Sequence, residues 1–156
     1  MLRPAIPFRP RVAVILTAIL LTAGAAVAHE GATGVVAQRM EAMKQMGQHM
    51  KALGHMLAGK TPFDHDAASR LAQTMHEHCE HVMHMFPPGS DGHHTEATAA
   101  VWTNRAEFDA RMRRFDAAIE ELMAAAASGD KAQLAAEFKA VGQECSGCHD
   151  NFRQKK

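Results

Sequence analysis

Near its C-terminus the chain carries two cysteines three residues apart with a histidine directly after the second, Cys145-Ser146-Gly147-Cys148-His149. The spacing C-x-x-C-H is the attachment signature of c-type haem, in which two thiols bond to the haem and the imidazole coordinates the iron from one face. A thioredoxin-like pair should follow a strand, which this sequence does not indicate, and a zinc site needs further cysteines when only Cys79 remains. The motif therefore predicts one covalent haem c held by Cys145 and Cys148, with His149 as its proximal ligand.

The first 28 residues have the features of a secretory signal peptide. Three arginines precede an apolar run at 12–21, and Ala26-Val27-Ala28 is an A-x-A cleavage pattern. The apolar run is short for a membrane span, which needs about 20 residues. We therefore expect a leader at 1–28 and one exported domain at 29–156. Since bacteria attach haem covalently after export, we also expect a periplasmic location with no membrane attachment after cleavage.

Charge and motif content exclude several classes of function. Removing the three leader arginines from 17 basic residues leaves 14 against 17 acidic ones, a net charge near −3 with histidines neutral. A nucleic-acid-binding domain would be strongly basic. The sequence contains neither a nucleophile–base pair nor a phosphate-binding loop, so we expect a protein that is not an enzyme. Cys79, left over in an oxidising compartment, is expected to be a buried structural thiol.

Apolar residues recur in steps of three and four, the period of a helix that buries one face. Four helical segments are predicted, at about 35–58, 64–86, 98–127 and after Asp130, which caps the last one. In the last segment one apolar stripe contains both motif cysteines: Leu134, Phe138, Val141, Cys145, Cys148 and Phe152. The fold class predicted is an all-α, antiparallel four-helix bundle with the covalently bound haem in its core.

Over essentially the whole exported sequence the chain resembles the class II c-type cytochromes, the cytochrome c′ family. The resemblance rests on the C-terminal haem motif at 145–153, the loop at 86–90, Val101-Trp102 and the first helix. It implies a four-helix bundle with His149 as proximal ligand. High-spin members of the family present an apolar residue to the other face of the iron and bind small gases such as NO and CO. Low-spin members, of the cytochrome c-556 type, place a methionine there and carry electrons.

Met43 falls where the low-spin branch has its ligand, four residues after Arg39. Met46 and Met50 share its apolar stripe, whereas Met40 points away from it, and any of them could be core packing instead. Met/His ligation raises the reduction potential and closes the iron to substrates. The leading prediction is therefore a periplasmic one-electron carrier with axial ligands His149 and Met43. Periplasmic redox proteins would be its donor and acceptor, and the chain could be a monomer or a homodimer.

Arg39 lies one helical turn before Met43 and faces the same way. A guanidinium there could bind a haem propionate through charge-assisted hydrogen bonds. The alternative is a surface arginine whose stem covers apolar area while its head stays in water.

The second helical segment is unusually rich in histidine, and in this it departs from the family pattern. Four side chains spread over its outer face at helical spacing: Glu77, His78, His81 and His84. Imidazoles so placed could bind Cu, Zn or Ni, with His93 and His94 as further ligands. A solvated face that happens to contain histidine is the alternative. A metal-handling protein is accordingly a third candidate function, beside electron transfer and gas binding.

Overall fold

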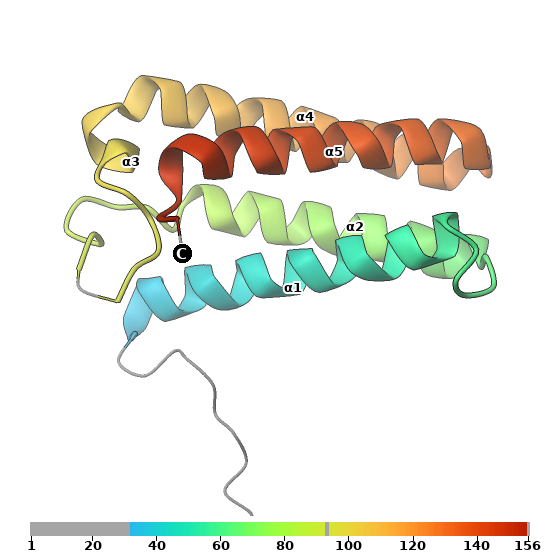
Figure 1. Cartoon of the computed structure of the whole chain (residues 1–156), viewed down its shortest axis with the longest axis horizontal. Helices are drawn as coiled ribbons and strands as arrows, with labels where there is room; N and C mark the ends of the chain where they lie inside the picture. Colours follow the sequence, from blue (N-terminus) through green and yellow to red (C-terminus); the bar gives the residue numbers. More distant parts are fainter. Residues whose placement is uncertain (1–31, 93, 156) are drawn as a thin grey trace, which may run out of the picture.

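The computed structural model describes residues 32–92 and 94–155 of the chain. Four long helices run alongside one another, and each is antiparallel to the one before it (Figure 1): α1 (Gly34–Leu57), α2 (His65–Met83), α4 (Arg105–Ser128) and α5 (Lys131–Phe152). The short helix α3 (Ala100–Thr103) precedes α4. The predicted all-α four-helix bundle is confirmed. The signal peptide predicted at 1–28 and the candidate ligand His93 lie outside the described residues.

Two aspartates start helices at the places where the sequence pattern changes. Asp64 accepts a hydrogen bond from the Ala67 backbone N–H at 2.9 Å and so begins α2. Asp130 accepts from the N–H groups of Ala132 and Gln133 at 2.8 and 3.0 Å, as the sequence predicted for the last helix. Gly129, with φ 77°, supplies the left-handed turn that ends α4 just before it. These local contacts fix where α5, the helix with the haem motif, begins.

The prediction of one continuous helix at about 98–127 is wrong. Asn104, with φ −118° and ψ 51°, interrupts it between α3 and α4. The interruption lets both sides reach the preceding loop: Trp102 Nε1 donates to the Pro87 carbonyl at 3.0 Å, and Arg105 Nη1 donates to the Phe86 carbonyl at 2.8 Å. These contacts with the preceding loop outweigh the local preference for an unbroken helix. Hydrophobic periodicity reports only that local preference, so it could not predict the break.

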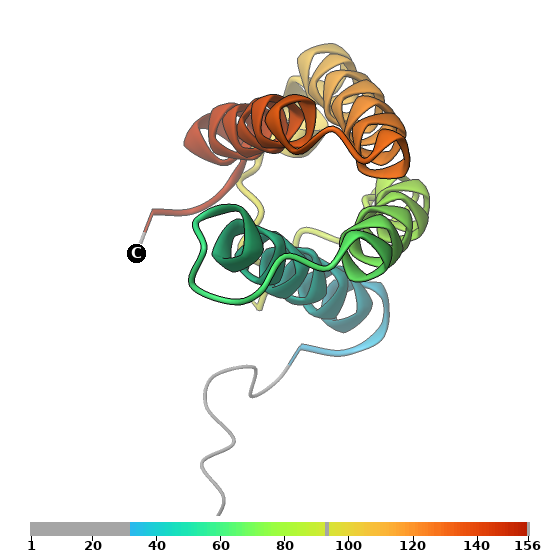
Figure 2. The same ribbon diagram turned by 90° about the vertical axis from the view of Figure 1, so that its right-hand side faces the viewer.

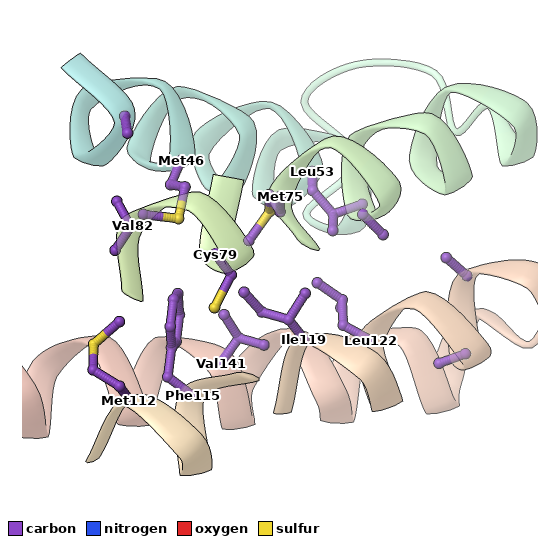
Figure 3. Packing of buried hydrophobic residues seen from close by; sticks show 14 of the residues in the cluster. Met46, Leu53, Met75, Cys79, Val82, Met112, Phe115, Ile119, Leu122 and Val141 are labelled. Atoms are coloured by element: carbon purple, nitrogen blue, oxygen red, sulfur yellow. The ribbon is translucent and has the colours of Figure 1, made fainter. Parts of the chain in front are cut away.

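The core is apolar and is built from all four long helices (Figure 3). Its largest fully buried side chains are Phe108, Leu53, Met75, Ile119, Leu122, Leu134, Val82, Val101, Val141 and Cys79. The packing is unequal: α4 packs most extensively against α5 and α2, whereas α1 packs mainly on α2 and little on α5. Seen end-on, the four long helices are arranged around a common centre, which the buried side chains fill (Figure 2). The seam between α1 and α5 is thus the least tightly packed one.

The end of α5 is joined to the loop before α3. Arg153 pairs with Ala97 in a β-bridge, and the Thr98 N–H donates to the Phe152 carbonyl at 2.9 Å. Arg153 also forms an ion pair with Glu96 at 2.8 Å. This connection holds the last turn of α5, which carries His149, against the loop that crosses the end of the bundle.

Candidate haem site

Two cavities, of about 390 and 230 Å³, lie among α1, α4 and α5. They share part of their lining, so they adjoin. The residues common to both are Met43, Met112, Cys148 and His149. Cys145 lines the smaller cavity. The predicted attachment and ligand residues are therefore brought together around one apolar space, which is the arrangement that a covalently held haem requires.

The attachment residues lie on the inner side of α5. Both Cys145 and Cys148 are half-buried free thiols that pack against the core. Burial raises the pKa of Cys145 to about 11, and it raises that of Cys148 against the opposing effect of the Arg111 charge. Both thiols therefore stay protonated at neutral pH. Formation of thioether bonds with haem would convert both thiols into groups that cannot ionise.

His149 has the protonation state that a metal ligand needs. Burial of its ring and the nearby Arg153 charge lower its pKa, against the smaller opposing effects of Glu96 and Asp150. A lowered pKa keeps the imidazole neutral at pH 7, with a lone pair free for coordination. Taken as a whole residue, His149 is nevertheless exposed; it lies on the last turn of α5 and lines both cavities.

The α1 methionines divide between the cavities. Met43 lines both, Met46 and Met50 line only the smaller one, and Met40 lines only the larger. The prediction that Met40 points away from the apolar stripe is compatible with this, since the larger cavity also reaches Lys44 of α1, which lies off that stripe. Among these methionines, Met43 shares both spaces with His149.

Met112 of α4 is a site residue that sequence reasoning missed. It is 5% exposed and lines both cavities. In the sequence it is one member of a regular apolar stripe, and nothing in its spacing separates it from ordinary core residues. Only the packing of α4 against α5 places it beside Cys148.

Arg39 is buried, with 3% of its surface exposed, and it contacts the loop that follows α2. Its Nη1 donates to the Met85 carbonyl at 2.8 Å and to Ser90 Oγ at 3.3 Å; its Nη2 donates to the Ser90 carbonyl at 3.0 Å and to Thr95 Oγ1 at 2.6 Å. The guanidinium also lies 4.5 Å from the Phe86 ring centroid. The alternative of a surface arginine is excluded. Burial lowers the pKa of Arg39. The side chain also lines the larger cavity. The contact with a haem propionate stays a prediction.

The histidine-rich helix does not assemble the predicted secondary metal site. Within residues 32–92 and 94–155, no three or more His, Cys, Asp and Glu side chains are placed to hold one metal ion. His81 Nδ1 is 2.6 Å from the Glu77 carbonyl oxygen of its own helix. His78 instead stacks on His49 of α1, with ring centroids 5.6 Å apart. Helical spacing put Glu77, His78, His81 and His84 on neighbouring turns but could not show that His78 would face α1.

Cys79 is fully buried, as expected of a structural thiol. It points from α2 towards α4 and α5 (Figure 3). Burial, together with Asp116, raises its pKa to about 12. The thiol is thus un-ionised and unreactive at neutral pH.

The site geometry agrees with comparison to known proteins. A family profile described as Cytochrome C′ matches residues 34–153, which include all four long helices and the whole haem motif. The chain belongs to the cytochrome c′ family. Membership implies covalently bound haem c and a role in electron transfer or gas binding. The cavities beside Cys145, Cys148 and His149 fit that cofactor.

Relatives of both kinds predicted from the sequence are found. The chain is 37% identical over 118 residues to a cytochrome c′ of Rubrivivax gelatinosus, covering 75% of this chain and 92% of the relative. It is 30% identical over 123 residues to a cytochrome c-556 of Agrobacterium tumefaciens, covering 79% and 99%. These two names correspond to the two branches of the family that the resemblance distinguished.

Solved structures agree in fold. The crystal structure of cytochrome c′ from Rubrivivax gelatinosus superposes with a TM-score of 0.74 at 36% identity, over 77% of this chain and 94% of that one. A nitric oxide complex of a cytochrome c prime variant from Alcaligenes xylosoxidans superposes with the same score at 30% identity, over 78% and 94%. No helix among the described residues is long and apolar enough to cross a membrane.

Proposed function

We propose that this cytochrome c′ family member is a periplasmic one-electron carrier whose haem has His149 and Met43 as axial ligands. The observation that carries the proposal is that Met43 and His149, from different helices, line the same two cavities. Met43 is also half-buried at the seam between α1 and α5, within the apolar surroundings that thioether ligation favours. Other periplasmic redox proteins would supply and accept the electron.

When bound, haem c supplies a one-electron Fe(III)/Fe(II) couple. The residues of this chain hold and shield it. Cys145 and Cys148 would fix its edge to α5, and Phe86, Phe108 and Phe152 would exclude water from the larger cavity, which they line. Ligation by His149 and Met43 would block other molecules from the iron, and rigid helices would keep reorganisation small.

The competing function is gas binding at a five-coordinate iron, with Met43 as a packing residue. It is favoured by the similarity to the nitric oxide complex described above. Among the known relatives both cytochrome c′ and cytochrome c-556 names occur, so similarity alone does not choose between the two functions.

Visible absorption of the haem-loaded protein, oxidised and reduced, tests the proposal. Sharp, split reduced bands together with a weak far-red band in the oxidised form would identify six-coordinate Met/His ligation. Broad, unsplit reduced bands and ready carbon monoxide binding would identify an open iron, and the gas-binding function would then replace electron transfer.

A further inference from the structure

Arg111 of α4 lies directly against the backbone of the haem attachment motif. A Cβ atom built on Gly147, between the two cysteines, would lie 2.6 Å from Arg111 Nη1 and 3.6 Å from its Cζ. The guanidinium therefore occupies the space that any larger residue at Gly147 would need. The charged end of the Arg111 side chain therefore closely approaches the turn of α5 that carries both thiols.

The Arg111 side chain is held in that place by its own helix. Its Nε donates to Glu107 Oε1 at 3.1 Å, one turn earlier, and 28% of the side chain is exposed. Glu107 Oε1 also accepts from Arg114 Nη2 at 3.3 Å. Arg114 Nε in turn lies 3.8 Å from Glu144 Oε2, which belongs to the residue just before Cys145. Alternating charges thus connect α4 to the start of the haem motif.

The charge of Arg111 lies next to the attachment residues. Its guanidinium lies against Gly147, the residue directly before Cys148. Cys148 lines both cavities, so its sulfur is at the edge of the space in which the haem would lie. A positive charge beside the residue that precedes Cys148 would therefore also be close to the attached macrocycle.

We infer that Arg111 is a positioning residue of the haem site: it braces the Cys145–Cys148 turn and its charge raises the reduction potential of the attached haem. Reduction of ferric haem adds one negative charge, which a fixed cation nearby stabilises more than it stabilises the oxidised form. The partial burial of Arg111 reduces the screening of this interaction by water and salt. The inference rests on covalent haem attachment but not on which residue is the distal ligand.

The test is the reduction potential of haem-loaded Arg111→Met, compared with wild type and with Arg113→Met. Arg113 is exposed and points about 200° away around α4, so it controls for the loss of one positive charge anywhere on this helix. We expect a lower potential in Arg111→Met, a smaller decrease in Arg111→Lys and little change in Arg113→Met. Equal potentials in Arg111→Met and Arg113→Met would overturn the inference.

A double-mutant cycle with Gly147→Ala tests the contact independently. In wild type the new methyl group would push the guanidinium aside, so Gly147→Ala should lower the potential as Arg111→Met does. In the Arg111→Met background the same change should have a smaller effect, because the charge is already absent. Additive effects would contradict the contact. Failure of the wild type to carry covalent haem would contradict the proposed function, whereas loss of haem in Arg111→Met but not in Arg113→Met would support the bracing role. Haem content is therefore measured separately for each protein.

Discussion

At the scale of single residues, the position of Met43 is the most consequential for function. We expect Met43→Ala to convert low-spin haem to high-spin haem and to open the iron to carbon monoxide, because the thioether is the proposed distal ligand. The visible spectrum and a carbon monoxide titration of the ferrous form would measure this. Met50→Ala is the matched control, since Met50 lines only the smaller cavity. An unchanged spectrum in Met43→Ala would mean that another residue coordinates the iron.

Arg39 is the second residue for which the structure predicts a large effect. Arg39→Met keeps the length of the stem but removes four hydrogen bonds to Met85, Ser90 and Thr95. Buried acceptors left without donors cost about 1–3 kcal/mol each, with incomplete additivity, so we expect a loss of about 3 kcal/mol in the free energy of unfolding. Urea unfolding of the haem-loaded protein would measure it. Arg113→Met, at an exposed position, should stay within about 0.5 kcal/mol of wild type.

At the scale of helices, the cap of α5 should contribute measurably to stability. Asp130→Ala removes the carboxylate that accepts from two backbone N–H groups, at a cost of about 1 kcal/mol. Asp130→Asn retains an acceptor and should recover most of the loss. Thermal unfolding followed by circular dichroism distinguishes the two variants, and equal melting temperatures would contradict the capping role.

The contact between α1 and α2 should be sensitive to pH. Burial and the adjacent His78 lower the pKa of His49, whose Nδ1 is buried without a hydrogen-bond partner. The unfolded chain therefore binds more protons than the folded one at slightly acid pH, so stability falls as pH decreases through about 6.5 towards the lower pKa of the folded state. Urea unfolding at pH 7.5 and 5.5 would measure the decrease. His49→Gln should reduce it, whereas His84→Gln, at an exposed position, should not.

At the scale of the whole molecule, the haem is expected to be part of the core. Without haem, the cavities of about 390 and 230 Å³ leave the side chains that line them without apolar neighbours on that side. An apolar group that fills such a space restores these contacts and stabilises the fold. The double variant Cys145→Ser, Cys148→Ser should consequently unfold at a much lower temperature than the haem-loaded protein, and an unchanged melting temperature would contradict this.

Most of the fold could be predicted from the sequence, because helical periodicity, Pro/Gly loops and the Asp130 cap are local signals. The haem attachment motif is a local signal too, because its residues are consecutive in the sequence. Three features depended on packing between distant segments and could not be predicted: the break at Asn104, the inclusion of Met112 in the site, and the hydrogen bonds of Arg39. The direction in which His78 points is of the same kind, since it depends on His49 of a different helix.

The unequal packing of α1 has a consequence for motion. Since α1 packs little against α5, the helix that carries Met43 should be the one that separates from the bundle at the lowest free energy. Amide hydrogen exchange in the haem-loaded protein should accordingly be faster for α1 than for the interior of α4. Each such opening would break contact between Met43 and the site while α5 keeps both cysteines and His149 in place. The lifetime of the sixth bond to iron would then be set by how tightly a single helix is docked.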